Sequence, residues 1–191
     1  MRSGHVFDLS DAALVERARR GDAAAFESLV RRHYRTAYAA AFGVLSNRMD
    51  AEDACQDAFV RALEKLDELR QPERFAAWLV RIARNRAHNL RSYRRVRAAQ
   101  PLDTVSVPGL ANPHGDMARG ELRGRLEAAL ALLSDTEREV VLLHDLYGWK
   151  HREIADAIEV SEGMSRQHLM TARRRLREQL GGATLEEYRD E

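Results

Sequence analysis

Apolar residues recur at three- and four-residue steps along most of the chain, which predicts amphipathic helices and no strands. The longest stripe follows Asp22, a helix-capping residue, and continues for about six helical turns. Its members are Phe26, Leu29, Val30, His33, Ala37, Tyr38, Ala41 and Leu45. Shorter stripes predict a first helix capped by Ser10 or Asp11, a third helix beginning at Asp50, and a fourth from about Glu73 to Val96. The pattern therefore predicts an all-α N-terminal half.

The C-terminal half contains the helix start and stop signals of a helix-turn-helix motif. Ser134 and Glu137 have the spacing of a capping box, so a helix should start there, and Gly148 can end it in the left-handed conformation. A second helix is expected over residues 150–158, and Ser161 can cap a third. The three short helices joined by tight turns predict a DNA-binding motif.

Between residues 98 and 118 the helical pattern disappears, and three of the four prolines lie there. Such composition predicts a flexible linker. It separates an N-terminal four-helix domain, residues 10–97, from a C-terminal helix-turn-helix domain, residues 119–180, whose first helix should span Arg119–Leu133. Residues 181–191 form a tail. The expected fold class is all-α, with two small helical domains.

The composition, 45% hydrophobic and 32% charged over 191 residues, is ordinary for a globular protein. The net charge is only +1, but the charges are segregated. Residues 50–73 hold eight acids and three bases, whereas residues 81–97 hold seven arginines and no acid. Two adjacent blocks of opposite sign predict two different partners.

Several protein classes are disfavoured by the sequence. The lone Cys55 excludes an internal disulfide. No apolar run approaches the roughly 20 residues needed to span a bilayer, and Met1–Asp8 lacks a signal-peptide core. We therefore expect a cytoplasmic protein. His33 lies on an apolar stripe without a second ligand four residues on, so a packed histidine is favoured over a metal ligand.

The residue pattern of the last predicted helix is typical of a DNA-recognition helix. Residues 166–177 contain five arginines and no acid, and its opposite face carries Leu169, Ala172 and Leu176. Polar side chains near the start of such a helix can reach base edges, while later arginines meet phosphates. The alternative is a basic helix that is merely solvated.

The fourth helix of the N-terminal half carries arginines, which commonly bind DNA phosphates, and asparagines, which can hydrogen-bond to base edges. These residues are Arg81, Arg84, Asn85, Asn89 and Arg91. Phe75 and Trp78 could stack on an unpaired base, but their place on the apolar stripe favours core packing.

Asp53, Gln56 and Asp57 share one side of the third helix. Acids in a first turn are favoured by the helix dipole, which could explain Asp50 and Asp53 but explains Asp57 less well. A divalent-metal site is conceivable, but no histidine or second carboxylate helix completes it. Docking onto a basic protein surface is the favoured interpretation.

Two sets of motifs resemble one known family. Residues 50–59 (DAEDACQDAF) and 75–87 (FAAWLVRIARNRA) are similar to the N-terminal domain of the extracytoplasmic-function (ECF) group of bacterial sigma factors. Five further segments of this chain resemble the C-terminal domain of the same group: Leu133-Ser134, Glu137–Val141, Gly148, Glu153–Ala155 and Ala172–Leu176. The resemblance covers residues 11–96 and 119–180.

The resemblance implies a non-catalytic subunit, without a cofactor, that binds core RNA polymerase and directs it to promoter DNA. A cognate anti-sigma factor is a further expected partner. The residues implied to bind core polymerase are Asp50, Asp53, Gln56 and Asp57. Those implied for the minus-ten element are Arg81, Arg84, Asn85, Asn89 and Arg91, with the loop Asp67–Arg74 capturing a flipped base. Those implied for the minus-thirty-five element are Arg166, Gln167, Met170, Thr171, Arg173 and Arg174.

The sequence departs from the family pattern at several positions. Met164 and Ser165 replace a usual Thr-Val pair, so the recognition helix should be less firmly docked. Thr171 replaces a common arginine, and Asn89 stands where an acid is frequent. The resemblance therefore does not supply the promoter sequence.

Two other functions are compatible with parts of the sequence. A stand-alone helix-turn-helix regulator would explain the C-terminal half but leave residues 50–96 without a role. A helical metal-dependent phosphohydrolase could use His144 and Asp145 with the carboxylates of the third helix. No earlier histidine lies on a matching face, which disfavours such an enzyme.

Overall fold

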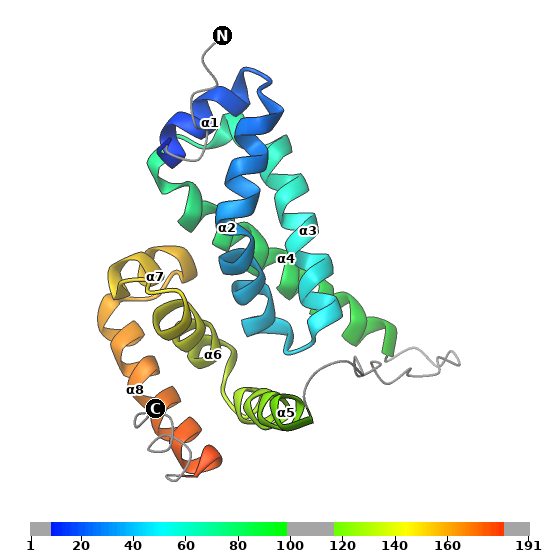
Figure 1. Ribbon diagram of the computed structural model, residues 1–191, viewed down its shortest axis with the longest axis vertical. Helices are drawn as coiled ribbons and strands as arrows, with labels where there is room; N and C mark the ends of the chain where they lie inside the picture. The colour runs from blue at the N-terminus through cyan, green and yellow to red at the C-terminus, as the bar shows by residue number, and fades with distance from the viewer. Residues whose placement is uncertain (1–8, 99–116, 182–191) are drawn as a thin grey trace.

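The computed structural model describes residues 9–98 and 117–181, and every regular element in these ranges is helical. The N-terminal unit contains α1 (Asp11–Arg19), α2 (Ala23–Leu45), α3 (Arg48–Glu64) and α4 (Phe75–Ala98). The C-terminal unit contains α5 (Met117–Ala131), α6 (Asp135–Val141), α7 (His151–Ile158) and α8 (Glu162–Leu180) (Figure 1). The predicted all-α fold with two helical units is confirmed.

Most helices begin at the predicted caps. Ser10 and Asp22 accept hydrogen bonds from first-turn amides of α1 and α2. Ser134 and Glu137 form the complete capping box, with the Ser134 amide donating to the Glu137 carboxylate at 2.9 Å. Ser161 caps α8. These contacts satisfy amides that have no partner within the helix, which fixes where each helix starts.

The predicted start of the third helix was wrong. Asn47 caps it by accepting from the Asp50 amide at 3.1 Å, so α3 begins at Arg48. The asparagine side chain thus satisfies the amide of Asp50, which has no partner within the helix. Asp50 consequently lies inside the first turn of α3.

The connection between α3 and α4 is fixed to α1. It consists of two short 3₁₀ turns, Leu66–Glu68 and Pro72–Arg74. Arg19 of α1 donates to the carbonyls of Leu66 and Leu69, both of which have buried side chains. The loop Asp67–Arg74, predicted to capture a flipped base, is therefore hydrogen-bonded to Arg19 of α1 through its first residues.

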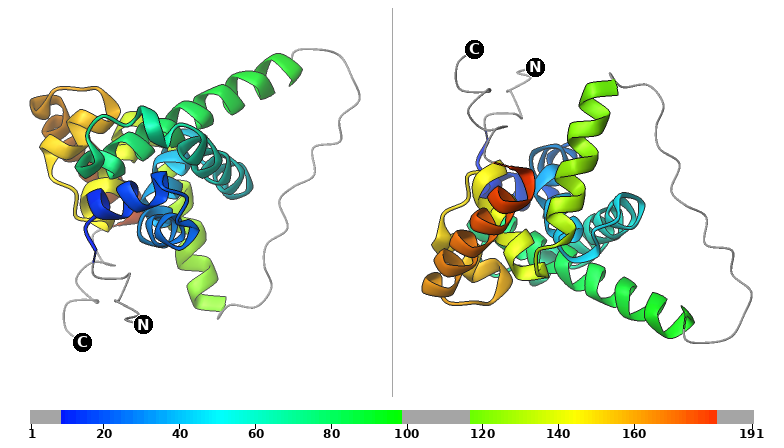
Figure 2. Two further views of the ribbon diagram at one scale, coloured as in Figure 1. Left: turned by 90° about the horizontal axis from the view of Figure 1, so that it is seen from above. Right: turned by 90° about the horizontal axis from the view of Figure 1, so that it is seen from below.

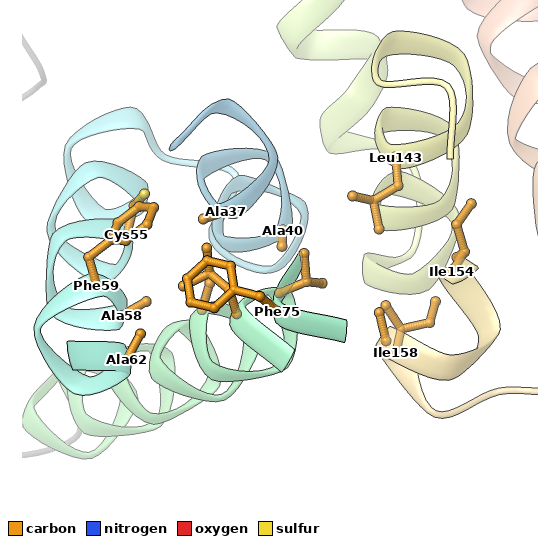
Figure 3. Close-up of a cluster of buried hydrophobic side chains, with 14 of the residues drawn as sticks. Ala37, Ala40, Cys55, Ala58, Phe59, Ala62, Phe75, Leu143, Ile154 and Ile158 are labelled. Atoms are coloured by element: carbon orange, nitrogen blue, oxygen red, sulfur yellow. The ribbon is translucent and has the colours of Figure 1, made fainter. Parts of the chain in front are cut away.

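One cluster of buried apolar side chains extends through both units. In Figure 3, Phe75 of α4 lies against the alanines of α2, while Leu143 and Ile158 of the C-terminal unit lie across from it. The Phe75 ring is fully buried, with its centroid 5.5 Å from that of His33 and 6.0 Å from that of Trp78. Core packing of Phe75 is confirmed, and Trp78 packs against the same cluster while partly buried. His33 is packed as well and lies 2.8 Å from the Asp11 carboxylate.

The C-terminal helices lie along one side of the N-terminal bundle, as the views from above and below both show (Figure 2). α6 packs on α2, and α7 packs on α4, whereas α8 packs on α5, α6 and α7. The two units are thus in direct contact through α6 and α7. Within the described residues, no helix is both long and apolar enough to cross a bilayer.

The buried thiol of Cys55 permits a prediction. Burial, with a smaller contribution from Glu52, raises its pKa to about 12. The thiolate is the reactive form, and a raised pKa keeps the thiol protonated throughout the neutral range. We expect Ellman's reagent at pH 8 to modify the native protein only as fast as α3 unfolds, and the guanidinium-unfolded protein at once. Rapid modification of the native protein would contradict this burial.

Candidate protein and nucleic-acid interfaces

A groove between α3 and α4 carries most of the predicted acidic face. Asp53, Gln56 and Asp57 are exposed along one edge. The lining residues are Asp53, Ala54, Gln56, Asp57, Arg86, Asn89, Leu90 and Tyr93. All of them belong to α3 and α4. Acids on one edge and the exposed Tyr93 ring on the other suit a basic segment with some apolar surface.

Inside the groove, Asp57 pairs with Arg86 of α4. The Nε of Arg86 is buried and is the one buried side-chain N or O atom in the described part of the chain that lacks a hydrogen-bond partner. A buried unsatisfied donor carries a desolvation cost. Arg86, which lines the groove, therefore has one buried donor without a partner.

Asp50 does not belong to this groove, although it was predicted with the other three residues. Its side chain is only 9% exposed and pairs with Arg94 near the end of α4. Asp50 lies four residues before the buried Ala54, so on the helix it shares the face of α3 that packs inward. We therefore separate Asp50 from the exposed docking face.

The arginines at the start of the candidate DNA face of α4 bind the C-terminal unit. Arg84 Nε donates to both carboxylate oxygens of Glu139, at 3.0 and 3.1 Å. Arg81 donates to the carbonyl of Asp156 at 2.9 Å and lies 3.4 Å from the Glu159 carboxylate. These contacts link α4 with α6, α7 and the turn after α7.

The remaining members of the predicted minus-ten set lie further along α4. Arg91 pairs with Asp135, at the first turn of α6, and donates to the carbonyl of Val44 at 3.3 Å. Asn85 and Asn89 are exposed. Three of the five predicted residues thus face the C-terminal unit, and the two asparagines remain accessible.

The predicted reading face of α8 is open. Gln167, Met170 and Arg174 are exposed and share one side of the helix at steps of three and four residues. Three of the predicted arginines have local partners: Arg166 pairs with Glu162, Arg173 with Asp145, and Arg174 with Glu178 at 4.0 Å. Thr171 is half-buried.

The expectation that Ser165 weakens the docking of α8 stays a prediction, but the structure gives this residue a buried partner. Its hydroxyl is fully buried and lies 3.0 Å from Nδ1 of His151, at the start of α7. A satisfied buried hydrogen bond replaces the missing apolar contact. Sequence spacing offered no sign of this partner, because the two residues lie on different helices.

Comparison with known proteins decides the family. Residues 29–98 match the model of sigma-70 region 2, and residues 123–176 match that of sigma-70 region 4. The RNA polymerase sigma factor NccH of Alcaligenes xylosoxydans xylosoxydans is 35% identical over 177 residues, which cover 87% of this chain and 92% of the relative. The ECF sigma-E factor of Escherichia coli K12 is 31% identical over 175 residues, or 86% and 91% of the two chains. The chain belongs to the ECF sigma factors.

Solved structures agree with this assignment. The ECF sigma factor resembles CnrH, solved in complex with the cytosolic domain of CnrY, with a TM-score of 0.67 and 30% identity over 91% of this chain and 99% of CnrH. It also resembles RpoE of Bartonella quintana, solved with the anti-sigma factor NepR, with a TM-score of 0.64 and 25% identity over 81% and 96% of the two chains. The stand-alone regulator alternative is not favoured, because the match to region 2 includes α3 and α4.

The two units of this ECF sigma factor approach each other closely at Gly43 of α2. A Cβ atom placed on Gly43 would lie 2.6 Å from Glu139 Cγ and 3.2 Å from Glu139 Cα. The neighbouring Arg138 is also buried, and donates to the Gly43 carbonyl at 2.5 Å. Only a residue without a side chain permits this approach.

The Glu139 side chain is wholly buried. Burial raises the pKa of its carboxyl to about 7, although Arg84 acts in the opposite direction. A carboxylate in such a place depends on its cationic partner, because an unpaired buried charge is strongly disfavoured. Sequence reasoning missed Gly43, Arg138 and Glu139, since nothing in a local pattern distinguishes a buried acid on an amphipathic helix from an exposed one.

His144 and Asp145, the basis of the enzyme alternative, have structural partners. Arg173 of α8 donates to Asp145 at 3.0 Å, and this hydrogen bond is the main cause that lowers the pKa of Asp145. The His144 ring stacks on His151 with centroids 4.7 Å apart. Among the described residues, no group of three or more potential ligands could hold a metal ion.

Proposed function

We propose that this ECF sigma factor docks on core RNA polymerase through the α3–α4 groove and reads promoter DNA through α4 and α8. The observation that carries the proposal is the separation of surfaces. An acidic groove lies on α3 and α4, while a different face of α4 carries the arginines Arg81, Arg84 and Arg91. Opposite charges on separate faces allow a basic protein and an acidic polymer to bind together.

Within the acidic groove, Asp53, Gln56 and Asp57 are the proposed polymerase contacts. On α4, Arg81, Arg84, Asn85, Asn89 and Arg91 would recognise the minus-ten element. On α8, Gln167 and Met170 would face base edges, and Arg166, Arg173 and Arg174 would anchor phosphates, with Thr171 beside them. The proposed domains are residues 10–97 and 119–180, joined by residues 98–118.

The protein would act without catalytic chemistry of its own, in the cytoplasm, where core polymerase and DNA are found. A cognate anti-sigma factor is a further proposed partner. The support is that CnrH and RpoE, the two structural relatives described above, were solved in complex with CnrY and with an anti-sigma factor.

Run-off transcription tests the proposal directly. Purified chain is added to core polymerase with fragmented genomic DNA of its own organism, and transcripts are mapped by their start sites. We expect discrete starts preceded by a shared pair of elements. Transcripts that are identical with and without the chain would refute the proposal, and a metal-dependent hydrolysis of phosphate esters would restore the enzyme alternative.

The proposed roles along α8 lead to a second prediction. In the holoenzyme, Gln167→Ala should weaken binding to the preferred minus-thirty-five duplex by about 1–3 kcal/mol and to scrambled duplex far less, since base contacts discriminate and phosphate contacts do not. Arg174→Ala is the matched comparison from the same exposed face and should weaken both duplexes alike. Competition binding at fixed salt measures both. If Gln167→Ala weakened binding to both duplexes equally, the base contacts would be assigned to Arg166 or Met170 instead.

A further inference from the structure

The C-terminal end of α4 is not fixed by apolar packing. All side chains from residue 91 to residue 97 are exposed, and the last buried side chain before them is that of Ala87. Both views in Figure 2 show this end of α4 extending beyond the rest of the N-terminal bundle. Apolar contacts therefore hold α4 as far as Ala87, and the end of the helix depends on polar contacts.

This exposed end also concentrates charge of one sign. Residues 91–97 contain four arginines and no acid. Arg91 lies three positions before Arg94 and four before Arg95, and like charges at these spacings destabilise a helix. The ends of helices are also the first parts to open. An anion held close to these arginines would therefore keep the end of α4 helical.

Asp50 of α3 supplies such an anion. Its nearly buried carboxylate pairs with Arg94, whose own side chain is half-exposed. The Asn47 cap fixes the turn of α3 that carries Asp50. Asp135 of the C-terminal unit pairs with Arg91 at the same end of α4, whereas Asp50 belongs to the helix that packs along α4. Asp50 can therefore hold this end of α4 within the N-terminal unit itself.

The Asp50–Arg94 pair has a counterpart two turns away, the Asp57–Arg86 pair. The two acids are seven residues apart on α3 and the two arginines eight residues apart on α4, as expected for antiparallel helices. Several groove residues lie between the two pairs: Asp53, Ala54, Asn89, Leu90 and Tyr93. Together the pairs fix the position of α4 against α3 on both sides of Asn89.

We propose that Asp50 is a positioning residue for minus-ten recognition and makes no contact with core polymerase: through Arg94 it holds the last turns of α4 helical and in place beside α3. This inference rests on the proposed function of α4. Asn89 and Arg91, two of the proposed minus-ten residues, lie beyond Ala87 in the part of the helix that the pair holds. Base contacts require side chains placed to within about 0.5 Å, so movement of this segment weakens DNA binding even though Asp50 touches no base.

Neutral substitutions in the full-length chain test this role. Asp50→Asn and Arg94→Ala each remove the pair, and their combination completes a double-mutant cycle. Asp53→Asn is a matched control, since it makes the same change one turn later on the exposed docking face. Arg95→Ala removes an equal charge from the same exposed end of α4. Because Arg94 is half-exposed, Arg94→Ala keeps the test informative if Asp50→Asn disrupts α3.

Three quantities are measured. Hydrogen exchange of the amides of residues 93–97 in the free chain, followed by mass spectrometry, reports how often the end of α4 opens. Titration of labelled chain with core polymerase gives the affinity for core. Anisotropy of a labelled single-stranded minus-ten oligonucleotide, whose sequence comes from the mapped start sites, gives the affinity of the holoenzyme at saturating core.

We expect Asp50→Asn, Arg94→Ala and the double variant to accelerate exchange at residues 93–97. All three should weaken oligonucleotide binding by the same factor, about three- to tenfold, because residues that act as one unit give non-additive effects. Their affinity for core polymerase should equal that of wild type.

The controls should behave differently. Asp53→Asn should weaken core binding and leave the exchange unchanged. Arg95→Ala should not accelerate exchange, and any loss of oligonucleotide affinity that it causes should add to that of Asp50→Asn, because the two residues are not paired.

Weaker core binding by Asp50→Asn would overturn the inference and return Asp50 to the docking face. Stronger oligonucleotide binding by Asp50→Asn, with weaker binding by Arg94→Ala, would also overturn it, because Arg94 would then contact phosphate and Asp50 would compete for it. Unchanged exchange, or faster exchange without a loss of oligonucleotide affinity, would exclude the positioning role. Failure of the proposed function is recognised separately: wild-type holoenzyme would then neither bind the oligonucleotide nor start transcription, whatever the exchange shows.

Discussion

Reversal of the two exposed acids in the groove, Asp53→Lys with Asp57→Lys, is expected to abolish binding to core polymerase while the helix content stays near that of wild type. The proposed partner surface is basic, and like charges brought together at an interface cost several kcal/mol. The folded chain should tolerate the change. Asp53 is exposed, and the pair between Asp57 and Arg86 is a partly exposed one, which typically contributes about 0–1 kcal/mol.

Co-purification with tagged core polymerase and light scattering of the mixture would measure the loss. A matched control reverses two other exposed acids, Glu16→Lys with Glu27→Lys, which pair with Arg19 and Arg31 on α1 and α2 away from the groove. This control has the same net charge as the test variant and should bind normally. If the groove variant still co-purifies with core, the docking site lies elsewhere.

The second large effect concerns stability. Phe75→Ala should lower the free energy of unfolding of the N-terminal unit by about 3–5 kcal/mol, because a fully buried ring leaves a cavity as well as losing its transfer free energy. Small domains have total stabilities of about 5–15 kcal/mol, so this single change should leave the N-terminal unit marginal near 37 °C. The lost contacts include the rings of His33 and Trp78.

Urea titration followed by circular dichroism measures this loss. Tyr93→Ala supplies the comparison, since Tyr93 is an aromatic residue of the same helix with 62% of its surface exposed. Exposed positions usually change stability by no more than about 0.5 kcal/mol. Similar losses for the two variants would mean that Phe75 does not anchor the start of α4 in the core.

The two disfavoured functions, a stand-alone regulator and a metal-dependent hydrolase, would each use a different part of the chain from a sigma factor. A stand-alone regulator would need only α6 to α8, whereas the match to sigma-70 region 2 covers residues 29–98. A hydrolase would need metal ligands, and His144 and Asp145 are instead held against His151 and Arg173. The proposed function gives the acidic groove and the basic face of α4 a role each, whereas neither alternative does.

The helices and their order could be predicted from the sequence because helix formation depends on contacts three and four residues apart. The caps at Ser10, Asp22, Ser134 and Ser161 and the apolar stripes are local signals of this kind. The exposed acidic edge, Asp53, Gln56 and Asp57, followed from the same periodicity. Asn47 was missed as a cap because the acids that follow it offered a competing start.

Only the tertiary structure decided which polar residues are buried and with whom they pair. Glu139 binds Arg84 across 55 positions of sequence, and Ser165 binds His151 from a neighbouring helix. Asp50 likewise turned inward to Arg94. Such pairs form because packing removes water from both groups at once, and a buried polar group must then find its partner within the fold. The sequence by itself determined the helices and the face on which each polar residue lies, and packing decided which of those residues stay exposed and which pair across the structure.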